Sequence, residues 1–173
     1  MSWWVIPLKL EPVETLMHAD RRLTFQVLTA FGNGGAAGGS SRVIEEDGPN
    51  RKLVEFQTPV RKGGKTVKTR EWVETFEPSE VRFHGVKGPL QLLEDRITLT
   101  EEDGCTRFRY ESTIGICGWW LGWLMSRFYA KRIVERLMRD HVPEMKAMVE
   151  ERAKRSKLFA QTCGAALEAT TRQ

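Results

Sequence analysis

Hydrophobic and polar positions along the chain follow two periods, that of a strand and that of a helix. From residue 41 to residue 116 the pattern predicts strands rich in Val, Ile, Phe, Thr and Trp. These strands are Arg42–Glu46, Lys52–Thr58, Thr66–Phe76, Glu80–Val86, Leu90–Thr100 and Cys105–Ile116. Asp, Gly, Pro and Asn residues separate them, so we expect an antiparallel meander.

The last predicted strand alternates most clearly. Apolar or small side chains occupy every second position from Phe108 to Ile116, with Tyr110 among them. The intervening positions hold Arg107, Arg109, Glu111 and Thr113. One face of this strand should therefore be in water, and the other should face a core or a cavity.

Two shorter elements precede the meander. Val13–Met17 predicts a strand, and helical spacing of apolar residues predicts a helix over Arg21–Phe31 with Asp20 as its N-cap. The glycine-rich segment 32–39 follows a helix and precedes a strand-like sequence. That order does not fit a P-loop or a dinucleotide-binding loop, so we interpret the segment as a flexible connector.

A long helix is predicted after Gly118. Its apolar stripe runs through Leu121, Leu124, Phe128, Val134, Leu137, Met138, His141, Met145, Met148 and Val149. Pro143 should kink this helix or split it in two. Residues 118–157 hold ten Lys and Arg against five Asp and Glu, so the surplus positive charge of the chain lies here.

This order of elements is that of the helix-grip fold, and three segments carry a more specific resemblance. They are Met17–Asp20 with the helix after it, Gly88–Arg107 with its Asp103-Gly104 turn, and the closing helix from Gly122 to Lys146. Over about residues 11–155 the sequence resembles the START-like superfamily (SRPBCC), nearest its polyketide cyclase/dehydrase and lipid-transport group.

The resemblance implies an α+β fold in which a curved antiparallel sheet of about seven strands wraps around the C-terminal helix and leaves an apolar cavity. It also implies an N-terminal extension over 1–10, a domain over 11–157 and a tail over 158–173. The superfamily has no universal catalytic triad, so no catalytic residue is transferred. Asp20 stands where many relatives have proline, and the short connector leaves little room for a second helix.

Ligand binding in this cavity is the function that we expect. The candidate ligand-binding residues are Arg70, Phe83, His84, Phe108, Tyr110, Ile114, Phe128, Leu137 and His141. Arg70, His84 and Tyr110 are the polar candidates for orienting a lipid-like, quinone-like or polyketide-like ligand. The methionines of the last helix suit either an ordinary core or an adaptable cavity.

An enzyme using the same cavity is the alternative from another class. A histidine with a tyrosine or a carboxylate, such as Asp95, could transfer protons as a polyketide cyclase or dehydratase requires. A buried histidine that only forms hydrogen bonds explains the same residues, and His141 could serve carbonyl groups freed by Pro143. We therefore favour a binding protein without assigning catalytic residues, and we expect no metal or cofactor.

Aromatic and basic residues gather at the start of the last helix. They are Trp119, Trp120, Trp123, Arg127, Lys131 and Arg132. Three tryptophans within five residues cannot all point inward, so this segment either covers the cavity mouth or docks on an anionic membrane or a partner. Acidic residues cancel half of the positive charge on the helix, and no nucleic-acid motif accompanies it, so nucleic acid is not expected.

Composition narrows the cellular setting. The chain has 173 residues, which suits one domain, and a mean hydropathy of −0.41, which excludes an integral membrane protein. Its N-terminus does not resemble a signal peptide, so we expect a cytoplasmic protein, with peripheral membrane contact as the variant. Three cysteines without a CxxC pair argue against a disulfide framework or a zinc site and favour a reducing compartment.

Overall fold

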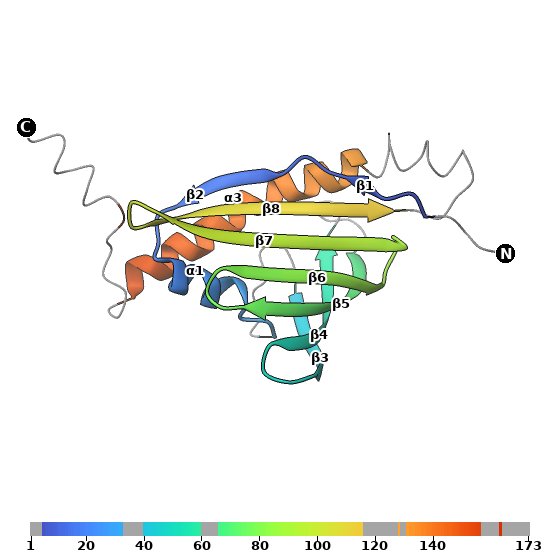
Figure 1. The fold of residues 1–173 in the computed structure, drawn as a ribbon, viewed down its shortest axis with the longest axis horizontal. Helices are drawn as coiled ribbons and strands as arrows, with labels where there is room; N and C mark the ends of the chain where they lie inside the picture. Colours follow the sequence, from blue (N-terminus) through green and yellow to red (C-terminus); the bar gives the residue numbers. More distant parts are fainter. Residues whose placement is uncertain are drawn as a thin grey trace, which may run out of the picture.

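The fold consists of one antiparallel sheet with two helices packed on one of its faces (Figure 1). The computed structural model describes residues 5–32, 40–59, 66–115, 128, 131–156 and 163. Its strands are β1 (Leu8–Lys9), β2 (Val13–Met17), β3 (Ser40–Glu46), β4 (Arg51–Pro59), β5 (Thr66–Phe76), β6 (Glu80–Lys87), β7 (Leu92–Glu102) and β8 (Cys105–Gly115). Its helices are α1 (Arg21–Leu28) and α3 (Lys131–Arg155). The predicted α+β architecture is confirmed.

The sheet is the expected meander with one addition. Its eight strands include the run β8-β7-β6-β5-β4-β3, in which each strand pairs with its neighbour in the sequence. β1 and β2 both pair with the free edge of β8, where Leu8 lies opposite Ile114 and Val13 lies opposite Tyr110. The two-residue strand β1 is the addition, because so short a segment has no recognisable period. The sheet thus begins before residue 11.

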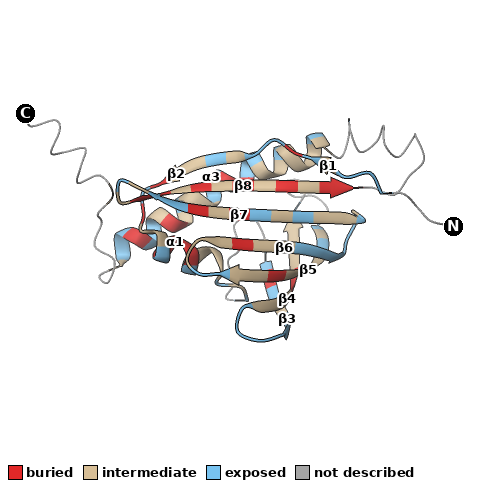
Figure 2. Ribbon diagram, in the orientation of Figure 1, coloured by how far each residue is buried: buried red, intermediate tan, exposed pale blue. Residues whose placement is uncertain are grey.

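Strand alternation directs one face of the sheet to the helices and the other to water (Figure 2). On β8, Phe108, Tyr110 and Ile114 are buried, as predicted. Arg107 and Arg109 lie on the outer face and form ion pairs with Glu102, Glu14 and Glu111. Phe108 and Tyr110 join Val54, Val73, Val81, Ile97 and Leu99 in the core, and Ile114 packs with Leu10 in a smaller cluster.

Helix α1 begins where the sequence predicts and lies against the start of β8. Asp20 caps it by accepting bonds of 2.8 and 3.2 Å from the backbone N–H groups of Arg22 and Leu23. The buried Thr106 hydroxyl donates a 2.8 Å hydrogen bond to the carbonyl of Ala19, which ties the helix entrance to the sheet. The helix ends at Leu28, three residues short of the prediction.

Helix α3 runs through Pro143 without a break, so of the two predicted outcomes, a kink or a split, the split is wrong. The helix packs against α1 and β2. Val142, Val149 and Ala153 are buried on its inner side. Of the helices that the structure describes, none is both long and apolar enough to cross a membrane.

A disulfide joins Cys105, the first residue of β8, to Cys163 in the C-terminal region. The sequence analysis argued against disulfides from the odd number and wide spacing of the cysteines, and on this pair it was wrong. Spacing along the chain does not report spacing in the fold: 58 positions separate residues whose Cα atoms lie 4.6 Å apart.

Candidate functional site

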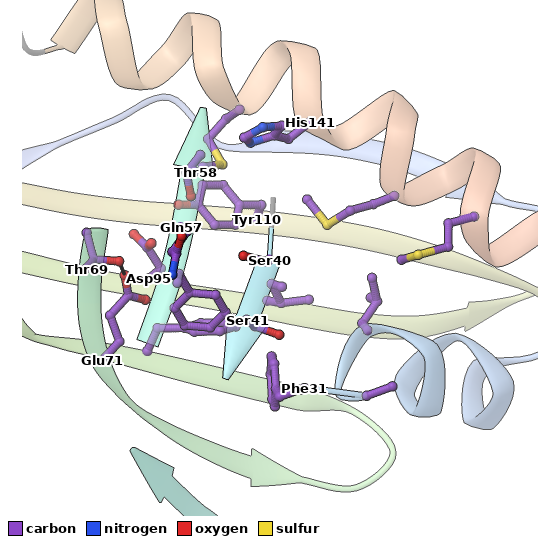
Figure 3. Close-up of a pocket in the computed structure, with 18 of the residues that line it drawn as sticks. Phe31, Ser40, Ser41, Gln57, Thr58, Thr69, Glu71, Asp95, Tyr110 and His141 are labelled. Carbon is purple, nitrogen blue, oxygen red and sulfur yellow. Dashed lines mark hydrogen bonds between the residues drawn. The ribbon is translucent and has the colours of Figure 1, made fainter. Parts of the chain in front are cut away.

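A cavity lies between the inner face of the sheet and α3, in two adjoining chambers, and Figure 3 shows the one that Phe31 borders. The first, of about 180 Å³, extends toward the end of α1 and Phe31, and we name it the Phe31 chamber. The second, of about 340 Å³, extends toward Leu90 and the first turns of α3, and we name it the Leu90 chamber. The residues that border both are Thr58, Thr69, Glu71, Asp95, Tyr110, Met138 and His141.

The walls of the cavity are mostly apolar. In the Phe31 chamber, Phe31 meets Phe56 and Phe83 edge-on, with ring centroids 5.9 and 6.3 Å apart. Methionines of α3 form the opposite wall. Aliphatic side chains surround the Leu90 chamber, from β5, from the turn between β6 and β7, from β7 and from α3. Such walls suit the apolar body of a small molecule.

Two carboxyl groups interrupt this apolar surface. Glu71 projects inward from the middle of β5, is 7% exposed, and accepts a 2.6 Å hydrogen bond from the hydroxyl of Thr69. Asp95 projects inward from β7, and its Oδ1 is inaccessible to water and has no hydrogen-bond partner among the described residues. Gly85 of β6 lies opposite Glu71 in the register, so at this position β6 adds no side chain between β5 and β7.

Two hydroxyl groups of β8 lie beside Asp95. Ser112 is the direct cross-strand partner of Asp95, and Tyr110 is the next inward residue along β8. Both side chains are at least 95% buried, and neither hydroxyl has a well-formed hydrogen bond within the described part of the chain. Unpartnered buried polar groups are rare in folded proteins, and those bordering a cavity are available to a ligand.

Burial sets the protonation of these groups. It raises the pKa of Glu71 to about 7, against the hydrogen bond from Thr69, and the negative charge of Asp95 raises it further. Burial likewise raises the pKa of Asp95 to about 6, while the hydroxyls of Ser112 and Tyr110 lower it. Burial and the nearby Asp95 raise the pKa of Tyr110 well above its usual range. Near neutral pH the cavity therefore holds carboxyl groups that exchange protons easily.

No known family profile matches the sequence, and no curated protein matches it. Solved structures do. The aromatase/cyclase Zhui from a Streptomyces species matches with a TM-score of 0.69 and 12% identity, over 87% of this chain and 95% of that one. A START superfamily protein from Mycobacterium smegmatis matches with a TM-score of 0.58 and 9% identity, over 86% and 97%.

The chain has the START-like helix-grip fold. The di-domain aromatase/cyclase BexL also matches, with a TM-score of 0.66 and 13% identity, and this chain spans 50% of its length. These likenesses concern the fold, which confirms the predicted helix-grip architecture and the START-like resemblance.

Within this START-like fold, the structure places four of the nine candidate ligand residues on the cavity: Phe83, Tyr110, Leu137 and His141. Two others, Phe108 and Ile114, are fully buried but pack in the core and in a smaller cluster beside Leu10. The difference follows from position along β8, because the cavity is bordered by Tyr110, which lies between Phe108 and Ile114.

The remaining three candidates lie away from both chambers. Arg70 is on the outer face of β5, where it pairs with Glu55 at 3.1 Å, and His84 is exposed on the outer face of β6. Each is one position from an inward residue, and neighbouring residues of a strand face opposite sides. Phe128 is 55% exposed. The structure thus places these three at the surface of the molecule.

The proposed gate lies largely outside the described residues, which do not include Trp119, Trp120, Trp123 or Arg127. The glycine-rich segment 33–39 and most of the tail also lie outside them. Lys131 and Arg132 are on the first turn of α3, where Lys131 pairs with Glu135. Peripheral membrane contact stays a prediction.

Glu71 and Thr69 are the residues that the sequence analysis did not consider, and Asp95 was noted without being assigned to the site. The alternation of residues along β5 indicates that Glu71 points inward. Val73 and Glu71 share a face, so a buried valine two positions away marks Glu71 as inward.

Proposed function

We propose that this START-like protein binds or carries a hydrophobic small molecule in the Phe31 and Leu90 chambers. The observation that carries the proposal is the form of the cavity: apolar walls from sheet and helix surround a few polar groups gathered in one place. Burial of the apolar surface of a ligand would supply most of the binding free energy, at about 25 cal/mol per Å². The polar groups would fix its orientation.

Titration with N-phenyl-1-naphthylamine, a neutral dye that fluoresces in apolar surroundings, tests this proposal. We expect saturable binding at one site per chain. Met138→Trp fills the space where the two chambers meet and should weaken binding about tenfold or more. Arg139→Trp adds the same side chain at the next, exposed position of α3 and should leave binding unchanged. A dye that does not bind, or equal affinities in both variants, would contradict binding in this cavity.

Acid–base catalysis is the second candidate function, and the carboxyl groups of the cavity favour it. Glu71 and Asp95 have pKa values of about 7 and 6, close to the values at which a group both accepts and donates a proton. Fold neighbours that are named aromatase/cyclases support a reaction of the polyketide cyclase or dehydratase type.

Proton exchange in a simple ketone tests this second function. Acetonaphthone in deuterated buffer exchanges its methyl protons slowly, and NMR follows the exchange. An acid–base site should accelerate it, and Glu71→Gln should remove the acceleration while the dye still binds. Exchange no faster than in buffer alone would exclude catalysis of this kind. The proposed binding function would be unaffected.

A further inference from the structure

The two carboxyl groups of the cavity lack a counter-charge. The described lining of the two chambers contains no Lys or Arg. Its titratable residues are Glu71, Asp95, Tyr110 and His141. The basic side chain of this lining is that of His141 on α3, and it forms no ion pair with either carboxyl within the described part of the chain. Carboxylates buried without a positive partner are costly.

Positive charges on the outer face of the sheet do not serve this pair. Arg82 and Arg96, the nearest such residues on β6 and β7, both bind Glu80. Arg70 binds Glu55. Lys9 and His84 border a hollow on the outer face that Asp95 also lines, and neither forms an ion pair with Asp95 among the described residues.

Hydrogen-bond acceptors converge on the same place. Glu71 accepts a bond from Thr69 on one side. Asp95 Oδ1 and the buried hydroxyls of Tyr110 and Ser112 make no hydrogen bond of good geometry among the described residues, although both hydroxyls lie close enough to Asp95 to lower its pKa. An ammonium group carries three hydrogen-bond donors and one positive charge. It would therefore supply the donors and the counter-charge that the cluster lacks. The described residues bring together no group of three His, Cys, Asp or Glu able to hold a metal ion, which favours an organic cation.

The aromatic wall fits such a cation as well. Phe31, Phe56 and Phe83 form one cluster, with centroids 5.9 to 6.3 Å apart, on the chamber that Glu71 and Asp95 also border. Aromatic faces attract ammonium groups, and the rings provide an apolar surface for the rest of the molecule.

We propose that the ligand of this cavity is a hydrophobic amine, bound as the ammonium ion by Glu71 and Asp95, with its apolar body in the flanking chambers. This inference rests on the proposed binding function and narrows its ligand class. Binding of the cation stabilises the ionised carboxylates, so each amine that binds should displace protons from them near pH 6.5.

Three probes of one shape test the charge preference: 2-(2-naphthyl)ethylamine, 2-(2-naphthyl)ethanol and 2-naphthylacetic acid. Calorimetric titration at pH 7.5 should give an affinity for the amine about tenfold or more above that for the alcohol, with the acid weakest. At pH 6.5 the binding heat of the amine should depend on the ionisation enthalpy of the buffer, which reports proton release. The heat for the alcohol should not.

Variants locate the preference. Glu71→Gln and Asp95→Asn, which keep the shape of each side chain, should reduce the preference for the amine to about threefold or less, and the double variant should remove it. Glu94→Gln, an exposed acid one position away on the outer face of β7, should keep it. Because the first two substitutions remove buried charge, both variants should fold, which circular dichroism checks.

Each outcome separates this inference from the binding function. If amine and alcohol bind equally, or the acid binds best, the cavity has another counter-charge and the inference is wrong, while hydrophobic binding stands. If the amine is preferred but Glu71→Gln and Asp95→Asn keep the full preference, the cation binds elsewhere and the inference is also wrong. If neither the three probes nor the neutral dye binds, the proposed function itself fails.

Discussion

The hydroxyl of Thr69 donates a 2.6 Å hydrogen bond to the carboxylate of Glu71, two residues further along the same face of β5. This bond favours the ionised carboxylate, and burial of Glu71 opposes it. Burial prevails, because the pKa of Glu71 is raised to about 7 from 4.5. The folded protein therefore holds a proton that the unfolded chain releases over this pH range.

The stability of the protein should fall between pH 5.5 and pH 8. A carboxyl group with a raised pKa in the folded state stabilises the fold below the unfolded pKa, and this contribution is lost as pH rises through the folded pKa. Glu71 and Asp95 act over the intervals from 4.5 to about 7 and from 3.8 to about 6. We expect the free energy of unfolding, measured in urea, to fall by about 1–3 kcal/mol over this range.

Glu71→Gln should make this dependence shallower, and Glu94→Gln should leave it unchanged. Surface ion pairs such as Glu102 with Arg107 act in the opposite sense, since the arginine lowers the pKa of Glu102. Their effect lies at more acidic pH, outside the measured range. A free energy of unfolding that rises from pH 5.5 to pH 8 would contradict a raised pKa at Glu71.

Removal of the Tyr110 hydroxyl should not destabilise the folded protein. Tyr110 and Ser112 each bury a hydroxyl without a well-formed hydrogen bond in the described structure, so Tyr110→Phe and Ser112→Ala remove a cost of burial. At pH 5.5 we expect the free energy of unfolding to rise by up to about 1 kcal/mol in each variant.

Thr106→Val is the matched comparison for these hydroxyl variants. The Thr106 hydroxyl is fully buried and bonded to the carbonyl of Ala19, so its loss should lower the free energy of unfolding by about 1–2 kcal/mol. Equal destabilisation by Tyr110→Phe and Thr106→Val would show that Tyr110 is bonded in solution, and would leave it no free hydroxyl for a ligand.

Local patterns were sufficient to predict most of the fold. Thr66–Phe76 was predicted with the bounds that β5 has, and Asp20 was predicted as the cap of α1. These features depend on alternation, turn residues and a capping side chain, all of which are read within a few positions. The pairing of Cys105 with Cys163 and the continuity of α3 through Pro143 depend on contacts between distant segments, and sequence spacing does not contain them.

The candidate site was predicted less completely. Tyr110 was placed inward because β8 alternates without interruption. His84 was named as a candidate for orienting the ligand but lies on the outer face of β6, and a register shift between Arg70 and Glu71 marks an irregularity in the neighbouring strand. Acidic residues in strands are mostly on the water face, so Glu71 was not considered, and Asp95 was noted for acid–base chemistry without being assigned to the site. Their role emerges only when burial on the cavity and the absence of a basic partner are known together.

The disulfide between Cys105 and Cys163 should form in oxidising buffer and stabilise the fold. It closes a loop with a sequence separation of 58, for which loss of chain entropy in the unfolded state contributes about 2–4 kcal/mol. Reduction, or Cys163→Ser, should lower the free energy of unfolding by that amount, and Cys117→Ser should not. Alkylation of the denatured, unreduced protein followed by mass spectrometry should label one of its three cysteines. Labelling of all three would contradict the bond.

Two phenylalanines that the sequence analysis assigned to the ligand should behave in opposite ways. Phe108 is fully buried in the core, and Phe128 is 55% exposed. Phe108→Ala creates a cavity and should lower the free energy of unfolding by about 3–5 kcal/mol. Phe128→Ala removes an exposed ring and should change it by about 0.5 kcal/mol or less. Urea unfolding measures both.

A comparison of Phe128 with Phe83 tests which ring contributes to ligand binding. Phe128→Ala should leave the affinity for N-phenyl-1-naphthylamine unchanged, because the ring borders neither chamber in the described structure. Phe83→Ala, which removes part of the aromatic wall, should weaken dye binding severalfold. If Phe128→Ala instead weakens binding as much as Phe83→Ala does, the ring of Phe128 contributes to the binding site and the two chambers do not account for it alone.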